Sequence, residues 1–440
     1  MDKGDKVMKR LIENDLLAWK NNSSKKPLMV FGARQVGKTY SILKFGKENY
    51  ADMVCFNFEN NAPLCSVFEQ DLDVNRIIIA LTALSGKRII PEQTLIFFDE
   101  IQAAPKAVTS LKYFCENAPQ YHIIAAGSLL GVSVNRESVS FPVGKIDSLT
   151  MYPMNFREFL LATENKTLLQ MIEDSFVSNK PLVSVLHDKA LDLYKTYLLV
   201  GGMPECVLEY IGKKDFDFVR VKQNRIFNDY SSDMSKYATK AESVRHEATY
   251  NSVPSQLARE NKKFQYKLIK SGARSRQYED SILWLSKAGV VLKCEKVNEG
   301  KTPIDFYKDE SSFKIFMSDV GLLTAKMMVP YATVLSDINF GGEAKGAITE
   351  NYVAQQLVAN NVKLYYWASE NTAEVDFVMQ WREYVIPIEC KANDNVRSRS
   401  LKVYAGKYLP PYSIRISSKN FGFENGIKSV PLYAVFCIGN

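Results

Sequence analysis

The clearest chemical signature lies near the N-terminus, in the run Gly32-Ala33-Arg34-Gln35-Val36-Gly37-Lys38-Thr39-Tyr40. The spacing G-x-x-x-x-G-K-T follows an apolar run and precedes a helical pattern, as a phosphate-binding loop requires. Its glycines permit positive φ, so that successive N–H groups and the N-terminus of the next helix can face an anion. We predict that these residues bind ATP, with Lys38 on the β- and γ-phosphates and the Thr39 hydroxyl on Mg²⁺. The alternative is a chance match in a glycine-containing turn.

A second motif, Leu95-Ile96-Phe97-Phe98-Asp99-Glu100, is an apolar run that ends in two acids. We expect Asp99 to hold Mg²⁺ through water and Glu100 to act as the general base on the attacking water. An Asp-Glu pair at a strand end can also be a solvated helix cap, which is improbable at this distance behind a phosphate-binding loop.

A third apolar run, Ile123–Ala126, is followed by Gly127 and Ser128. Ser128 could sense the γ-phosphate or orient the water, and a role in capping the next turn is about equally compatible with the pattern.

These residues need a sheet to hold them together. Short apolar runs without polar alternation are typical of parallel strands that are buried on both faces; they occur at Leu28–Phe31, Met53–Phe58, Thr94–Phe98 and His122–Ala126. The helical patterns between the runs predict a doubly wound α/β fold. A short amphipathic helix over residues 5–20 should precede the first strand.

The rest of the chain has a different pattern. Residues 155–245 are helical, with a sharp break at Gly201–Pro204, and residues 250–300 fit a winged-helix-like module. From Ser312 a mixed pattern predicts a C-terminal α/β domain, with strands at FKIFMSD, KLYYWAS, AEVDFVMQW, YVIPIECKA, YSIRISS and LYAVF and helices at 344–360 and 398–408. We therefore expect five segments: 1–24, 25–158, 159–245, 246–330 and 331–440.

A further constellation of charged residues lies in this C-terminal part. Asp376 sits in an alternating strand pattern, and Glu389-Cys390-Lys391 ends the next strand. Carboxylates on neighbouring strands can share Mg²⁺, and a lysine two residues from Glu389 points to the same sheet face. There Lys391 could orient a water and stabilise charge on a cleaved phosphodiester. Glu350 lies on an otherwise apolar helix face, where an acid needs a partner.

Composition narrows the function classes. The 440 residues carry a net charge of +7, seven cysteines without a CxxC pair and three histidines, which argues against a structural zinc site. No apolar stretch approaches a membrane helix and the N-terminus lacks a signal-peptide pattern, so we expect a soluble, cytoplasmic protein without membrane contact. A basic cluster could contact DNA phosphates, or it could be a solvated helix face; it comprises Lys262, Lys263, Lys267, Lys270, Arg274 and Arg276.

Taken together, the motifs resemble the AAA-type ATPases, and more closely a bacterial and archaeal family that joins an AAA-like domain to a C-terminal domain with a restriction-endonuclease-like fold. The resemblance rests on words spread over most of the chain: GARQVGKTY, LIFFDEIQ, IIAAGSLLG, MYPMNFREFL, YLLVGGMPE, FNDYSSDMSKY, SVPSQLARENKKFQYKLI, WLSKAGVV and FKIFMSDVGLL. It implies homo-oligomers whose subunits complete one another's ATP sites. The family often has Gly-Arg where this chain has Gly144-Lys145, so an arginine finger is unassigned, with Arg136 and Arg157 as alternatives.

Asp376, Glu389 and Lys391 also resemble the PD-(D/E)xK nuclease pattern, in which a helical glutamate often joins the metal site; Glu350 matches that position. Glu374 could be a surface charge or could support that site. These resemblances favour an ATP-dependent switch or motor acting on DNA. The alternatives are an ATP-gated, Mg²⁺-dependent nuclease, and a signalling ATPase whose nuclease-like domain only binds a protein partner.

Overall fold

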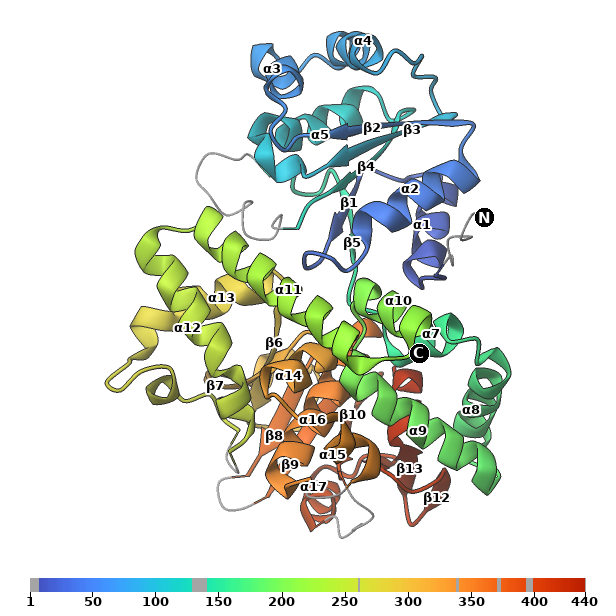
Figure 1. Cartoon of the computed structure of the whole chain (residues 1–440), viewed down its shortest axis with the longest axis vertical. Coiled ribbons are helices and arrows are strands. Elements are labelled where there is room, and N and C mark those ends of the chain that lie inside the picture. Colours follow the sequence, from blue (N-terminus) through green and yellow to red (C-terminus); the bar gives the residue numbers. More distant parts are fainter. Residues whose placement is uncertain are drawn as a thin grey trace. The chain divides into compact units, whose positions relative to one another are not determined.

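The computed structural model describes residues 8–128, 141–259, 262–337, 340–369, 373–392 and 399–439 (Figure 1). The chain divides into two compact units, which are Met1–Tyr152 with Lys287–Gly289, and Pro153–Ser286 with Val290–Asn440. The sequence predicts five segments, and the structure groups the last three of them in the second unit. Among the described residues, no helix has both the length and the apolar character needed to cross a membrane.

The first unit is built on a parallel sheet in the order β2-β3-β4-β1-β5. Its strands are β1 Leu28–Phe31, β2 Asp52–Asn57, β3 Thr94–Asp99, β4 His122–Ala126 and β5 Asp147–Thr150. The first four confirm the predicted strands. β3 and β4 are buried along their whole length, which explains why their sequences are nearly continuous apolar runs. β5 is not among the predicted strands, because this edge strand has the polar sequence DSLT and alternates between half-buried and exposed residues.

Helices cover both faces of this sheet, as predicted. They are α1 Ile12–Asn21, α2 Lys38–Asn49, α3 Ala62–Gln70, α4 Val74–Ser85 and α5 Pro105–Asn117, with the short 3-10 helix η1 Ile101–Ala103. The apolar sides of α3, α4 and α5 share one core with the sheet, whereas α2 and α1 lie on the other side (Figure 1). Local chemistry sets the helix ends: the Asp73 side chain accepts a hydrogen bond from Arg76 N at the start of α4, and Gly86 ends that helix in the left-handed conformation.

The second unit begins with a helical region, as the sequence predicts. Its helices are α7 Phe156–Ala162, α8 Lys166–Ser178, α9 Ser184–Val200, α10 Pro204–Lys213, α11 Phe216–Lys236, α12 Lys240–Leu257, α13 Ser275–Lys287, α14 Val320–Lys326, α15 Tyr331–Ser336, α16 Gly342–Ala359 and α17 Arg399–Tyr408. Short 3-10 helices are η2 Tyr266–Leu268, η3 Ile304–Tyr307 and η4 Leu432–Cys437.

An eight-stranded mixed sheet completes this unit, in the order β12-β13-β11-β10-β9-β8-β6-β7. Its strands are β6 Val291–Val297, β7 Lys308–Met317, β8 Tyr365–Ala368, β9 Glu374–Trp381, β10 Tyr384–Cys390, β11 Ser413–Ser417, β12 Gly422–Glu424 and β13 Ile427–Pro431. The strand expected at LYAVF is wrong: this segment forms η4. Pro431 ends β13 just before it, and the whole of η4 is buried, so its apolar run reflects burial and not strand periodicity.

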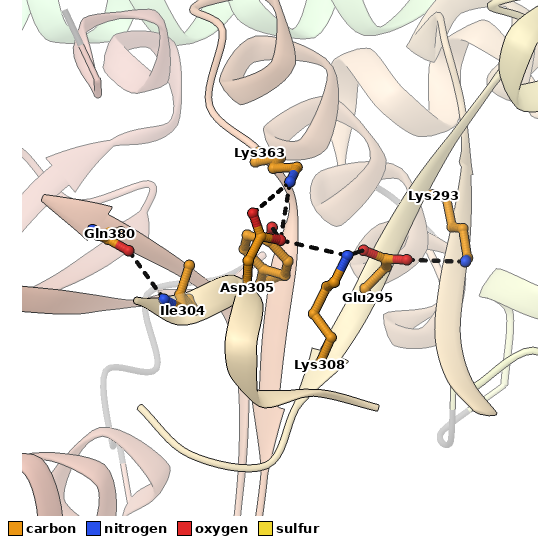
Figure 2. A network of polar contacts seen from close by, with 8 residues as sticks. Lys293, Glu295, Ile304, Asp305, Lys308, Lys363 and Gln380 are labelled. Carbon is orange, nitrogen blue, oxygen red and sulfur yellow. Dashed lines mark hydrogen bonds and ion pairs between the residues drawn. The ribbon is translucent and has the colours of Figure 1, made fainter. Parts of the chain in front are cut away.

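Strand β6, which lies in the segment expected to form a winged-helix-like module, belongs to this same sheet. β6 pairs with β7 on one side and runs parallel to β8 on the other. Figure 2 shows the polar contacts that hold η3 against this sheet. Asp305 forms an ion pair with Lys363 at 2.7 Å, and Ile304 N donates to the side chain of Gln380 on β9 at 3.0 Å. Lys308 then bridges Asp305 and Glu295 at 3.5 Å each. Because these groups are solvated, the ion pairs fix the position of η3 more than they add to stability.

A tightly packed corner joins the end of α9 to the start of α14. Asp319 is fully buried; it caps α14 through Leu322 N at 2.9 Å and accepts a hydrogen bond from Gly202 N at 2.6 Å. Gly201 has a φ of 74°, and a Cβ there would lie 2.2 Å from Asp319 Oδ1. The sequence segments YLLVGGMPE and FKIFMSDVGLL therefore contact each other at this corner.

We predict that Gly201→Ala destabilises the protein by at least about 2 kcal/mol, because it combines a strained backbone with a steric clash. The control is Gly212→Ala on α10, where a Cβ has open space and helix propensity favours alanine. Urea unfolding of both variants checks this. Equal stability of the two variants would contradict the assignment.

Candidate active site

The phosphate-binding loop connects the buried strand β1 to helix α2. Gly32, Gln35 and Gly37 all have positive φ, at 140°, 65° and 97°. A Cβ on Gly32 would lie 2.2 Å from Met151 O, so only glycine fits against the chain that follows β5. The loop thus has the backbone that the motif predicts, and it leads directly into the N-terminus of α2.

Lys38 and Thr39 occupy the first turn of α2. The buried Lys38 ammonium lies within the loop and donates to Gly32 O at 2.9 Å and Ala33 O at 2.8 Å. Thr39 Oγ1 lies 3.3 and 3.2 Å from the two carboxylate oxygens of Asp99. Of the other predicted nucleotide ligands, Ala33 and Val36 are buried, Arg34 and Gln35 are half-buried, and Tyr40 is exposed on α2.

Asp99 ends the buried strand β3 at the same edge of the sheet. Burial, and then repulsion from Glu100, raises the pKa of Asp99 above its usual range. Hydrogen bonds from Thr39 and from Glu100 N oppose this shift and favour the carboxylate. Asp99 therefore lies beside the first turn of α2, where a nearby cation would stabilise its charged form.

Glu100 takes a different direction from Asp99, because its φ of 50° turns the chain sharply after the strand. Its Oε2 accepts a hydrogen bond from Gln102 on η1 and lies 3.5 Å from Ser128 Oγ, which follows β4. A non-glycine residue in this region is strained, and such strain commonly accumulates at functional sites. Gln102 is not among the predicted site residues; its position two residues after Glu100 is the one feature of the sequence that indicates this contact.

The structure thus brings together Lys38, Thr39, Asp99, Glu100 and Ser128, as the parallel strands require. Their catalytic and magnesium-binding roles stay predictions. Of the residues considered for an arginine finger, Lys145 forms an ion pair with Glu116 at 3.0 Å and Arg157 one with Glu173 at 3.1 Å. Arg136 lies outside the described residues.

The C-terminal constellation lies on the hairpin of β9 and β10. Ile388 pairs with Phe377 in this antiparallel ladder, and Cys390 N donates to Asp376 Oδ2 at 2.7 Å. Lys391 Nζ lies 2.6 Å from Glu389 Oε1, so the two share a face as predicted. Burial, and then the charge of Glu350, raises the pKa of Asp376 well above its usual range.

Lysines neutralise the third acid of this constellation. Glu350 on α16 is only 7% exposed; its Oε1 accepts a short hydrogen bond from Lys262, and its Oε2 lies 4.0 Å from Lys314 Nζ. Lys314 on β7 is fully buried and also binds Glu374 at 2.5 Å. Lys314 is not among the predicted site residues, although a lysine inside the apolar strand FKIFM indicates a buried charge that needs a partner.

This arrangement bears on the predicted metal site. Within the residues that the structure describes, no group of three or more His, Cys, Asp or Glu side chains is placed to hold a metal ion. The Oε2 atoms of Glu350 and Glu389 are buried and accept no hydrogen bond there, yet each carboxylate already has an ammonium group beside it. The assignment of Glu350, Asp376 and Glu389 as metal ligands stays a prediction.

Known protein families match three separate parts of the chain. Residues 24–160 match the family described as AAA domain. Residues 191–332 and 345–435 match two families described as Domain of unknown function, DUF8612 and DUF4143. Neither description assigns a nuclease-like fold to the C-terminal part.

Individual relatives are distant. An uncharacterised protein of Methanocaldococcus jannaschii is 26% identical over 193 residues, which cover 42% of this chain and 39% of that protein's length. Among solved structures, the Walker-type ATPase of Pyrococcus abyssi is 14% identical with a TM-score of 0.44, covering 73% of this chain and 96% of that one. The ORC2 protein of Aeropyrum pernix is 12% identical with a TM-score of 0.36, covering 77% and 94%.

The family match over residues 24–160 falls on a parallel sheet whose first strand leads into a complete phosphate-binding loop. Residues 24–160 of this chain therefore form a P-loop domain of the AAA type.

Proposed function

We propose that the protein hydrolyses ATP with Mg²⁺ in its first unit and uses the nucleotide state to control contacts of its second unit with DNA. The observation that supports hydrolysis, beyond binding, is the placement of Glu100. Its carboxylate lies between Gln102 and Ser128 at the edge of the sheet that also holds Lys38 and Asp99. A carboxylate held in this way can accept the proton of an attacking water.

The side chains near the loop divide the remaining tasks. Lys38 would leave its carbonyl partners for the β- and γ-phosphates, whose charge attracts the ammonium more strongly. The Thr39 hydroxyl and the Asp99 carboxylate are oxygen donors of the kind that Mg²⁺ prefers, and they would hold it. When bound, Mg²⁺ neutralises charge on the phosphates. Ser128 would orient the water.

The AAA-type assignment favours homo-oligomers in which a neighbouring subunit supplies an arginine. We include a homo-oligomer in the proposal; a strict monomer in light scattering with saturating nucleotide would contradict it.

DNA contact is proposed for the segment that connects α12 to α13 and for the first turn of α13. Lys262 is engaged by Glu350, but the other basic residues of the cluster are exposed, namely Lys263, Lys267, Lys270, Arg274 and Arg276. Exposed cations on one short segment suit phosphate contacts that position DNA without reading its sequence. Lys262 and Lys314, which lie beside Glu350, favour this binding role over the nuclease alternative.

We predict that Lys38→Ala reduces ATP hydrolysis to background, because the variant loses the positive charge at the β- and γ-phosphates. Lys47→Ala is the matched control, since Lys47 is an exposed lysine near the other end of α2, and it should keep wild-type activity. Phosphate release in the presence of Mg²⁺ measures both. Full activity in Lys38→Ala would rule out the site assignment.

We predict that replacing Lys267, Lys270 and Arg274 together by alanine weakens DNA binding and lowers the slope of log K against log salt by up to about 2.7, if all three contact phosphates. Replacing Lys166, Lys180 and Lys189, which are exposed elsewhere in the second unit, changes the net charge equally and should have little effect. Titrations of duplex DNA at several salt concentrations, with ATP, ADP and no nucleotide, distinguish the two. Equal losses in both variants would show that binding reflects net charge alone.

A further inference from the structure

A buried arginine precedes the first helix, outside the residues that match the AAA domain. Arg10 is 5% exposed; its Nη1 donates to Val36 O at 2.6 Å, and its Nη2 donates to Tyr152 O at 2.8 Å. Val36 belongs to the phosphate-binding loop, and Tyr152 follows β5. One guanidinium group thus joins the N-terminal segment, the loop and the chain beyond the edge strand.

The bond to Val36 O has a direct consequence for the loop. Val36 C=O and Gly37 N–H belong to the same planar, trans peptide unit, so they point in opposite directions. Arg10 holds the carbonyl on its own side and thereby aims the Gly37 N–H toward the opposite side. In a loop of this type the phosphates are bound by such backbone N–H groups. A peptide next to Gly37 would otherwise rotate easily, since glycine permits many conformations.

Arg10 is itself held in place. Its backbone N donates to Glu13 Oε1 at 3.1 Å, and Glu13 binds Lys44 on α2 at 2.8 Å. Behind the loop, Met151 N donates to Phe31 O at 2.8 Å and fixes the chain that leads to Tyr152. A buried guanidinium needs acceptors for its N–H groups, and Val36 O and Tyr152 O supply two of them.

We propose that Arg10 is a positioning residue of the nucleotide site, which orders the phosphate-binding loop from outside the ATPase domain through the Val36–Gly37 peptide. The inference rests on the proposed ATP hydrolysis, since it concerns the same site. It makes the segment before α1 part of the machinery that binds ATP. A lysine at position 10 could reach one carbonyl but lacks the planar fork that spans two.

The test uses the full chain and compares Arg10→Ala and Arg10→Lys with Lys9→Ala, a neighbouring exposed residue. Affinity for a fluorescent ADP, kcat and KM for ATP, and the unfolding temperature are measured for each. We expect Arg10→Ala to bind nucleotide about tenfold more weakly, Arg10→Lys to lie between it and the wild type, and Lys9→Ala to be unchanged. Added methylguanidinium should restore affinity to Arg10→Ala and should leave Lys9→Ala as it is.

A lower unfolding temperature with unchanged nucleotide affinity of the folded protein would overturn the proposal, because Arg10 would then only anchor α1. Failure of methylguanidinium to restore affinity would also count against it. If Arg10→Ala does not fold, the affinity of Arg10→Lys decides, and wild-type affinity would overturn the proposal. A wild type that binds ADP without hydrolysing ATP would contradict the proposed function and leave the binding comparison valid.

Discussion

Strand order decides which side chains can meet at the phosphate-binding loop. β4 lies between β1 and β3, and the three strands are parallel, so their carboxyl ends share one edge of the sheet. The loop follows β1, Ser128 follows β4, and Asp99 ends β3. Ligands of open α/β sheets bind beyond the carboxyl ends of the strands. Every proposed step at the nucleotide depends on this edge, including the contact of Thr39 with Asp99 and the placement of Glu100.

The second unit depends on a different constraint, the burial of charge. Glu350, Asp376 and Glu389 are acids in a poorly solvated region, and Lys262, Lys314 and Lys391 lie among them. Removing one member of such a set leaves its partner uncompensated, which is strongly destabilising. The lysines therefore compensate the charge of these buried acids.

Much of the first unit could be predicted from sequence, because buried parallel strands read as apolar runs and the loop motif has fixed spacing. The edge strand β5 is polar and has no apolar run. The segment of η4 has an apolar run because it is buried, although it is not a strand. The nucleotide-site side chains were identified because each one belongs to the loop motif or lies at the end of an apolar strand. The contact of Arg10 with Val36 O could not be predicted, since it joins residues 26 apart through a backbone carbonyl that leaves no pattern in the sequence. The lysine partners of Glu350 were not identified from the sequence, because Lys262 and Lys314 lie far from Glu350 along the chain.

The central claim, that the first unit hydrolyses ATP and does not only bind it, is tested most directly by Glu100→Gln. This variant keeps the size of the side chain and its contacts with polar neighbours but removes the base. In the presence of Mg²⁺ it should bind radiolabelled ATP as tightly as the wild type and hydrolyse it at least about 100-fold more slowly. A Glu100→Gln protein that turns over ATP at the wild-type rate would contradict the account.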